Sequence, residues 1–146
     1  MQVLLGLQSN ALKFTEKGKV EILVNIFQND KLDKFLEISI IDTGIGIPYE
    51  DQDKLFKLFG FTQDTSQTNT KGIGIGLVIS ELIVHQFDGE ITFKSEPGVG
   101  SKFTFTIKLN NDQYNYNNNI ITNMVPKEYK VNSNQLVFNW KPDGKS

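Results

Sequence analysis

The sequence predicts an α+β fold, a two-layer sandwich in which helices pack on one face of a mixed, mainly antiparallel sheet. Two pairs of segments alternate apolar and polar residues, and two other segments carry apolar residues at helical spacing. Their order along the chain is helix, two strands, short helix, polar loop, helix and two strands. Because short turns join the strands of each pair, both pairs are expected to form antiparallel hairpins.

The first half of this pattern predicts one helix and one hairpin. Apolar residues recur near helical spacing over residues 2–14, and the polar run 16–19 then breaks the pattern, so a helix ending near Thr15 is expected. Apolar and polar residues alternate over 20–26 and again over 36–40, and the polar segment 28–34 provides the turn. This hairpin is expected to bury one face.

The second half predicts a short helix over 49–58, a mobile polar lid over 62–71, and a longer helix that begins after three glycines. The longer helix is expected to cover the sheet with an apolar stripe formed by Ile75, Val78, Ile79, Leu82 and Ile83. His85, on the same helix, is expected to be a partly buried structural residue. Alternation over 91–93 and 103–109 predicts the second hairpin.

The predicted domain spans residues 1–109, and residues 110–146 form an Asn-rich tail. This tail has too few apolar residues to offset the entropy of ordering and is expected to be largely disordered. Its apolar residues near the end could dock on the domain: Leu136, Val137, Phe138 and Trp140.

Composition is typical of one soluble globular domain. The 146 residues are 38% hydrophobic, and 15 basic against 17 acidic residues give a net charge of -2, which offers no general reason to bind nucleic acid. The absence of cysteine excludes disulfides, thiolate metal sites and a cysteine nucleophile. With no signal peptide and no membrane-length apolar run, a cytoplasmic location is expected, although a longer parent protein could be membrane-attached.

Asp42 is the first candidate binding residue. It has the same strand parity as Leu36 and Ile40, so its carboxylate is expected to point to the buried face, where it needs a donor. The glycines of the adjoining segment 42–48 leave room for a flat ligand, and a carboxylate is an acceptor suited to the exocyclic amine of adenine. The alternative is a turn-initiating aspartate bonded to the amides of its own loop, and the sequence leaves both open.

The first helix offers a second candidate group. Asn10, Lys13 and Phe14 share one face, which would place a Mg²⁺ ligand, a phosphate-binding ammonium and a ring for a base side by side. The alternative is a solvated Asn and Lys near a helix end, with the phenylalanine in the core. Ser101 turns a hydroxyl inward and either bonds near Asp42 or caps its strand.

Gly72, Gly74 and Gly76 precede the longer helix, where free amides and the helix dipole favour phosphate. Their spacing does not match the Walker A or dinucleotide-binding patterns, so a helix-start turn is as good an interpretation as a phosphate site.

Five segments, in this order, resemble the conserved boxes of the ATP-binding domain of histidine kinases, in the superfamily that includes gyrase and MutL. Residues 2–15 resemble the N box, 42–48 the first glycine box, 56–59 the F box, 71–77 the second glycine box and 98–103 the last one. Each box is weak alone, but together they cover residues 2–109. The resemblance implies two-component signal transduction, with transfer of the ATP γ-phosphoryl group to a histidine supplied by another chain and a response-regulator receiver downstream.

The resemblance also implies roles for individual residues. Asn10 would bind Mg²⁺, Lys13 phosphate and Asp42 the adenine amine, while Phe56 and Phe59 would anchor the lid. The remaining residues would shape the ATP pocket and lid: Phe14, Gly44, Gly46, Ile47, Lys71, Gly72, Gly74, Gly76, Leu77 and Ser101.

Three departures from the family pattern support alternatives. The family usually has asparagine at the position of Gly6, its domain normally begins with a further strand, and no phosphoacceptor helical hairpin is present. These departures favour a non-catalytic nucleotide-binding or interaction module as the second hypothesis. A gyrase-type hydrolase would need a carboxylate at Gly6 and is disfavoured.

Overall fold

A computed structural model describes residues 2–57, 73–109, 131–132 and 135–140, and the side chains of 2–57 and 75–109 within them. All strands belong to one sheet with the order β3-β4-β2-β1-β6-β5, and every described pairing is antiparallel. The elements are α1 (Gln2–Phe14), β1 (Val20–Gln28), β2 (Lys34–Asp42), α2 (Tyr49–Gln52), α3 (Ile73–Gln86), β3 (Ile91–Glu96), β4 (Gly100–Leu109), β5 (Val131–Asn132) and β6 (Gln135–Trp140).

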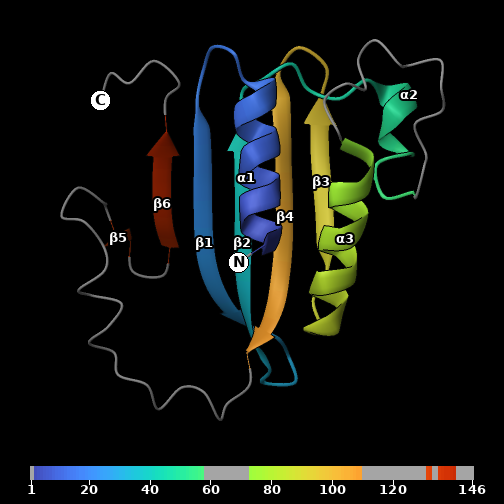
Figure 1. The fold of residues 1–146 in the computed structure, drawn as a ribbon. Coiled ribbons are helices and arrows are strands. Elements are labelled where there is room, and N and C mark those ends of the chain that lie inside the picture. Colours follow the sequence, from blue (N-terminus) through green and yellow to red (C-terminus); the bar gives the residue numbers. More distant parts are fainter. Residues whose placement is uncertain (1, 58–72, 110–130, 133–134, 141–146) are drawn as a thin grey trace.

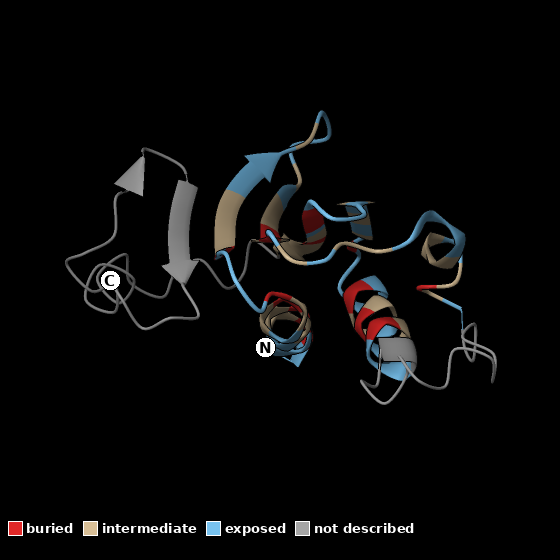
Figure 2. Cartoon of the chain, turned by 90° about the horizontal axis from the view of Figure 1, so that it is seen from above, coloured by how far each residue is buried: buried red, intermediate tan, exposed pale blue. Residues whose placement is uncertain are grey.

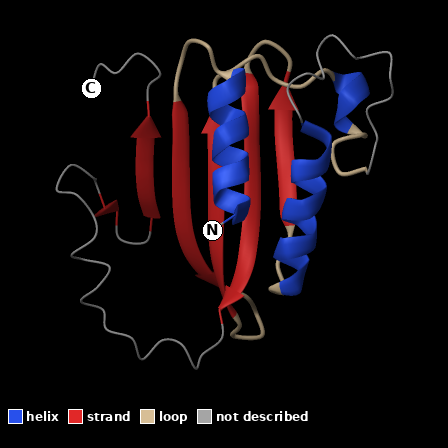
Figure 3. Cartoon of the chain, viewed as in Figure 1, coloured by secondary structure: helices blue, strands red, loops and turns tan. Residues whose placement is uncertain are grey.

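The predicted α+β sandwich is confirmed. Figures 1 and 3 show α1 and α3 side by side in front of the sheet, and the view from above in Figure 2 shows both helices on the same side. Both predicted hairpins are present as β1–β2 and β3–β4. The mixed character expected for the sheet is not found among the described strands, whose pairings are all antiparallel.

The hydrophobic core lies between the helices and the sheet. Every second residue of a strand faces the helices, and residues three or four apart on α1 face the sheet. Both sets are apolar here, so they meet in one layer. The buried apolar residues are Val3, Leu7 and Ala11 of α1, Val20, Ile38, Ile40 and Phe105 of the sheet, Leu77 and Val84 of α3, and Leu55.

The predicted orientation of α3 is wrong. Of the five residues expected to face the sheet, Ile75, Ile79 and Leu82 are 56%, 40% and 62% exposed. Val78 and Ile83 are half-buried, and Ile83 packs against the core, while Leu77 and Ser80, which were not in the stripe, are buried. Because α3 is apolar nearly all round, periodicity could not select its buried face. The contact with α1 selects it instead.

Small residues mark this helix–helix contact. A Cβ atom built on Gly6 of α1 would lie 3.9 Å from the Ser80 hydroxyl of α3. Small side chains allow a short distance between helix axes. His85 consequently lies off the buried face, 60% exposed and 3.9 Å from a Glu81 carboxylate oxygen, so its expected partial burial is also wrong.

The short helix α2 ends earlier than predicted. It stops at Gln52, and the backbone continues to residue 57 in turns whose N–H groups bond three residues back, as Lys54 does to Asp51. These tighter turns bring Leu55 inward, where it is 2% exposed.

The Asn-rich tail contributes two strands to the described structure. β6 pairs with β1 and includes the apolar residues expected to dock, whereas the sequence predicts a largely disordered segment. Residues 110–130, 133–134 and 141–146 lie outside the described residues, as does the predicted lid, so the expectations for them stay predictions. Among the described helices, none is both long enough and apolar enough to cross a membrane.

Candidate nucleotide-binding site

Asp42 lies where β2 ends, in one transverse row of the sheet with Val20 of β1 and Ser101 of β4. Its side chain is only 7% exposed, and Val20 and Ser101 are also buried. Strand parity predicts that Asp42 and Ser101 lie on the helix-covered face, and their burial confirms this. A carboxylate at this depth needs donors to replace water.

Two backbone N–H groups supply these donors. The amide of Gly44 donates to Asp42 Oδ1 at 2.9 Å, and the amide of Ser101 donates to the same carboxyl group. Burial raises the pKa of Asp42 above its ordinary value of 3.8, and these two amides and the nearby Thr15 hydroxyl lower the pKa in part. The turn-initiating role thus exists, but a carboxylate has about four lone-pair sites and can still accept from a ligand.

Thr15 is a site residue that the sequence patterns did not identify. It follows α1, is 2% exposed, and approaches Asp42 closely enough to influence the Asp42 pKa. Nevertheless its Oγ1 makes no hydrogen bond of good geometry with the described residues. Buried hydroxyls are nearly always partnered, so this oxygen is suited to a ligand atom or an ordered water beside Asp42.

The loop after Asp42 is fastened to the end of α1. The amide of Ile45 donates to the carbonyl oxygen of Phe14 at 3.2 Å, which satisfies one of the unpaired carbonyls at the helix terminus. A Cβ atom on Gly44 would lie 2.2 Å from the same oxygen, so no larger residue fits there. This contact brings the last turn of α1 to the end of the sheet that carries Asp42.

The same loop is also fastened to the β3–β4 turn. The amide of Gly98 donates to the carbonyl of Ile45 at 2.7 Å. Gly46 has φ +68°, and a Cβ atom on it would lie 2.1 Å from the carbonyl oxygen of Glu96. The glycines therefore permit close contact of the backbone with other protein backbone, and the expectation that they open space for a flat ligand is not supported on their Cβ side.

Ser95 and Gln52 complete this attachment, and no sequence pattern indicated either residue. Ser95 Oγ accepts from the Ile47 amide at 2.8 Å and donates to the carbonyl of Gly100 at 3.1 Å. Gln52 Nε2 donates to the carbonyls of Ile47 and Ser95 at 2.9 and 3.2 Å. Side chains thus bind both the N–H group and the carbonyl group of Ile47.

This arrangement fixes the direction of the Ser95–Ser101 hydrogen bond. The two hydroxyl oxygens lie 2.9 Å apart. Because Ser95 has one hydroxyl proton, and Gly100 receives it, Ser101 donates to Ser95. Ser101 Oγ then faces any ligand as an acceptor, like Asp42.

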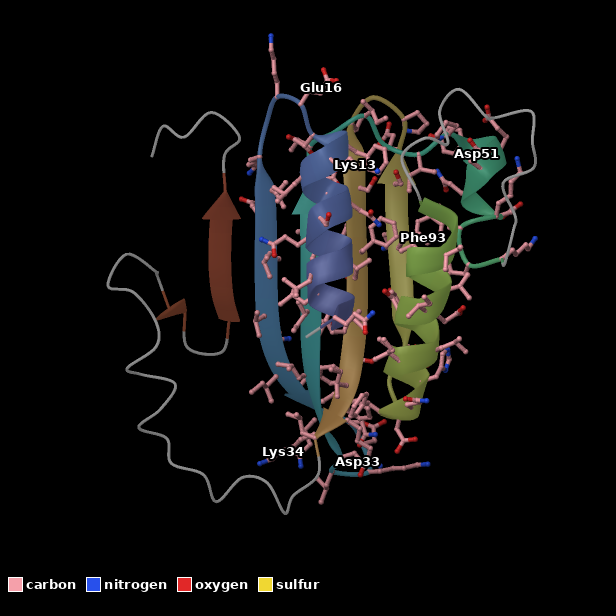
Figure 4. The ribbon with its side chains drawn as sticks, viewed as in Figure 1. Lys13, Glu16, Asp33, Lys34, Asp51 and Phe93 are labelled. Carbon is pink, nitrogen blue, oxygen red and sulfur yellow. The ribbon has the colours of Figure 1, made fainter. Side chains whose placement is uncertain are left out.

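On α1 the three predicted residues lie toward this end of the helix. Asn10 is half-buried, and Lys13 is exposed with its Nζ 5.9 Å from the centre of the Phe14 ring. Figure 4 shows Lys13 at the same end of the molecule as Glu16, while Asp33 and Lys34 mark the opposite end. The last turn of α1 and the loop after Asp42 therefore lie at one end of the sandwich, and the roles predicted for Asn10 and Lys13 stay predictions.

Residues 1–111 match the model of the family described as histidine kinase-, DNA gyrase B- and HSP90-like ATPase. The chain belongs to this family. It is 42% identical over 110 residues to the signal transduction histidine-protein kinase BarA of Escherichia coli strain K12, and 40% identical over 113 residues to the sensor histidine kinase RcsC of the same strain.

These matches cover most of this ATPase-family chain but little of its relatives. They span 74% and 77% of the chain, and only 12% of BarA and 11% of RcsC. A crystal structure of full-length ShkA in complex with AMPPNP superimposes with a TM-score of 0.53 at 30% identity, over 73% of the chain and 20% of ShkA.

In this ATPase-family chain the glycines near α3 lie differently from the prediction. The helix begins at Ile73, so Gly74 and Gly76 belong to its first turn instead of preceding it. A Cβ atom on Gly76 would meet no atom within 4 Å, whereas the side chain of Leu77 is buried in the core. Lys71 and Gly72 lie outside the described residues.

The segment before residue 58 is anchored on the β3–β4 hairpin. The Phe56 and Phe93 rings have centroids 5.9 Å apart, and Phe93 stacks on Phe103 at 5.7 Å. Phe56 therefore anchors the chain just before residue 58 on the sheet, and Phe59 lies outside the described residues. Aromatic pairs at these distances stabilise by about 0.5–1.5 kcal/mol beyond their burial.

Proposed function

We propose that this chain is the ATP-binding catalytic domain of a protein-histidine kinase, which transfers the ATP γ-phosphoryl group to a histidine on another chain in a two-component phosphorelay. Family membership and the names of BarA and RcsC support the reaction class. The observation that carries the proposal is the buried Asp42 carboxylate with the unpartnered Thr15 hydroxyl beside it.

Asp42, Thr15 and Ser101 are proposed to bind adenine. Asp42 accepts two backbone donors and keeps lone pairs for an exocyclic amine. The Ser101 hydroxyl adds a second acceptor and Thr15 a hydroxyl that can donate or accept. A site that is rich in acceptors and buried selects a ligand edge that carries an N–H donor, because a ligand lacking it would leave the carboxylate unpaired.

Asn10, Lys13 and the first turn of α3 are proposed to hold the phosphates and Mg²⁺. No cluster of three or more acidic, histidine or cysteine residues that could bind a metal occurs in the part of the chain that the structure describes. This fits Mg²⁺ bound mainly by phosphates and water with one amide oxygen, from Asn10. When bound, Mg²⁺-ATP supplies the transferable phosphoryl group, and the chain positions it and stabilises its charge.

The proposal is tested first by thermal melting of the chain with and without Mg²⁺-ATP. At 100 times its Kd, ATP should add about 2.7 kcal/mol to the free energy of unfolding. Asp42→Ala should abolish this gain, whereas Lys34→Ala, at the opposite end of the sheet, should keep it. A folded parent chain whose melting temperature does not respond to ATP would contradict the proposed pocket.

The transfer step needs a separate experiment with a supplied acceptor. The chain is incubated with γ-labelled ATP and a purified domain that carries a phosphoacceptor histidine, and an acid-labile, base-stable phosphate is measured on that domain. Asp42→Ala should remove the label. ATP binding without any transfer would leave the nucleotide site standing and refute the kinase activity.

Gly6 favours a second candidate, a non-catalytic nucleotide-binding or interaction module. Gly6 is exposed on α1, and a Cβ atom there would find its nearest atom 3.9 Å away, so packing does not require glycine. Gly6→Asn restores the usual family residue, with Gly6→Ala as the control for helix propensity. Phosphoryl transfer gained only by the asparagine variant would show that the natural chain lacks a catalytic group and would support this second candidate.

A further inference from the structure

β6 lies beside the edge of β1, although the two strands are far apart in the sequence. Residues Gln135–Trp140 pair antiparallel with Asn25–Val20, and β5 forms a small hairpin with β6 on the outer side. Without β6, the edge of β1 would present a row of unpaired N–H and C=O groups, which is a template for pairing with another chain.

The two strands match in polarity at every paired position. Val20, Ile22 and Val24 of β1 belong to or pack against the core, and their register partners are Trp140, Phe138 and Leu136. On the opposite face the pairs are Glu21 with Asn139, Leu23 with Val137 and Asn25 with Gln135.

All six pairs thus join apolar to apolar or polar to polar residues. A shift by one residue in one direction would pair Val20 with Asn139 and Glu21 with Phe138, so the sequence favours the observed register.

We propose that the edge of β1 is a docking site for one strand and that its occupant is the chain's own segment Gln135–Trp140. The segment completes the sheet and shields the β1 edge from pairing with other chains. This proposal is independent of the proposed kinase function, because it concerns strand pairing alone.

The length of the connection favours docking within one molecule. Residues 110–130 separate β4 from β5, and a segment of this length can span about 70 Å when fully extended. A strand tethered in this way meets its own β1 at an effective concentration in the millimolar range, above that of a second copy in dilute solution.

Trp140 provides a natural reporter for this docking. It is the only tryptophan in the chain, and its register partner Val20 is in turn the register partner of Asp42. Trp140 therefore lies two strand spacings, about 10 Å, from Asp42 along the same row of the sheet. Its fluorescence reports the state of β6 next to the candidate site.

The test is amide hydrogen exchange of β1 in the full-length chain, measured residue by residue with NMR. Successive N–H groups of a strand point to opposite neighbours, so β2 protects only alternate amides of β1. We expect consecutive amides from Glu21 to Asn25 to be protected at a protein concentration where the chain is a monomer. Protection of alternate amides only would overturn the proposal.

Two matched variants test whether the apolar register pairs drive the docking of β6. Phe138→Lys should expose the remaining β1 amides, shift Trp140 emission to longer wavelength and promote concentration-dependent association. Asn139→Lys adds the same charge opposite Glu21 and should behave like the parent chain. Equal effects of the two variants would refute the proposed register, and β1 protection that appears only in a dimer would show that a second copy supplies the strand.

Discussion

The Ser95 hydroxyl on β3 accepts a hydrogen bond from the backbone N–H of Ile47 at 2.8 Å, so a residue 48 positions away holds the glycine loop. The same hydroxyl contacts Ser101 and the carbonyl of Gly100. One side chain therefore connects the loop after Asp42 to the strand whose backbone donates to Asp42. Ser95 is a positioning residue for the candidate site.

Replacing Ser95 by alanine should destabilise the chain and weaken ATP binding together. The Ile47 amide would lose its acceptor, and because this hydrogen bond is part-buried, the free energy of the folded state should rise by about 1 kcal/mol, the lower end of the range for an unsatisfied buried donor. Urea unfolding measures the loss, and titration with Mg²⁺-ATP measures the affinity. Thr92→Ala removes a hydroxyl from an exposed position of the same strand and should change neither; an equal effect of the two variants would contradict the positioning role.

Ionisation of Asp42 should make stability depend on pH. Because burial raises the pKa of Asp42 in the folded chain above its ordinary value of 3.8, the folded state binds more protons than the unfolded state between the two values. Linkage then requires the free energy of unfolding to fall as pH rises through this window. Relative to Asp42→Asn, the parent chain should lose stability over the window and change no further above it.

Urea unfolding at a series of pH values, with both proteins in parallel, measures this difference. A difference that instead grows in favour of the parent chain with rising pH would mean that ionised Asp42 stabilises the fold, as a paired carboxylate does. The burial of Asp42 would then not dominate its pKa.

The orientation of α3 predicts opposite outcomes for two leucines on one helix. Leu77 is 1% exposed and Leu82 is 62% exposed. Leu77→Ala should therefore destabilise the chain by about 2–5 kcal/mol through lost burial and a cavity. Leu82→Ala should stay within about 0.5 kcal/mol of the parent chain. Chemical denaturation measures the free energy of unfolding of both variants. A larger loss of stability for Leu82→Ala than for Leu77→Ala would mean that Leu82 faces the sheet, as periodicity predicts.

The sequence predicts the buried face of the strands better than that of the helices. Side chains of a strand can point only to one of two faces, whereas those of a helix point in all directions around its axis. Parity placed Asp42 and Ser101 on the covered face, where both are buried. The α3 helix is apolar on several sides, so its phase depends on packing against α1, a segment distant in the sequence. No local pattern contains that information.

Long-range hydrogen bonds explain the rest of what was missed at the candidate site. Ser95 and Gln52 act on Ile47 through the folded backbone, and serine or glutamine at such positions is otherwise unremarkable in the sequence. Thr15 lies at the end of the predicted helix, and its burial beside Asp42 follows only from the contact between the end of α1 and the glycine loop. The glycines are visible in the sequence, but the distant backbone atoms that leave no room for a Cβ atom at Gly44 and Gly46 are not.

Two helix glycines provide the sharpest test of the phosphate side of the site. Gly6 and Gly76 both lie in helices, and neither would place a new Cβ atom within 3.4 Å of another atom. Alanine at either position should stabilise the chain without ATP by up to about 1 kcal/mol, through helix propensity. In Mg²⁺-ATP the two variants should differ, since Gly76 lies in the first turn of α3, to which we assign the phosphates, whereas alanine at Gly6 is smaller than the asparagine usual in the family. Gly76→Ala should weaken ATP binding by about tenfold, or 1.4 kcal/mol, and Gly6→Ala should not. Melting curves with and without Mg²⁺-ATP separate the two effects, and equal ATP-induced stabilisation of both variants would remove the first turn of α3 from the site.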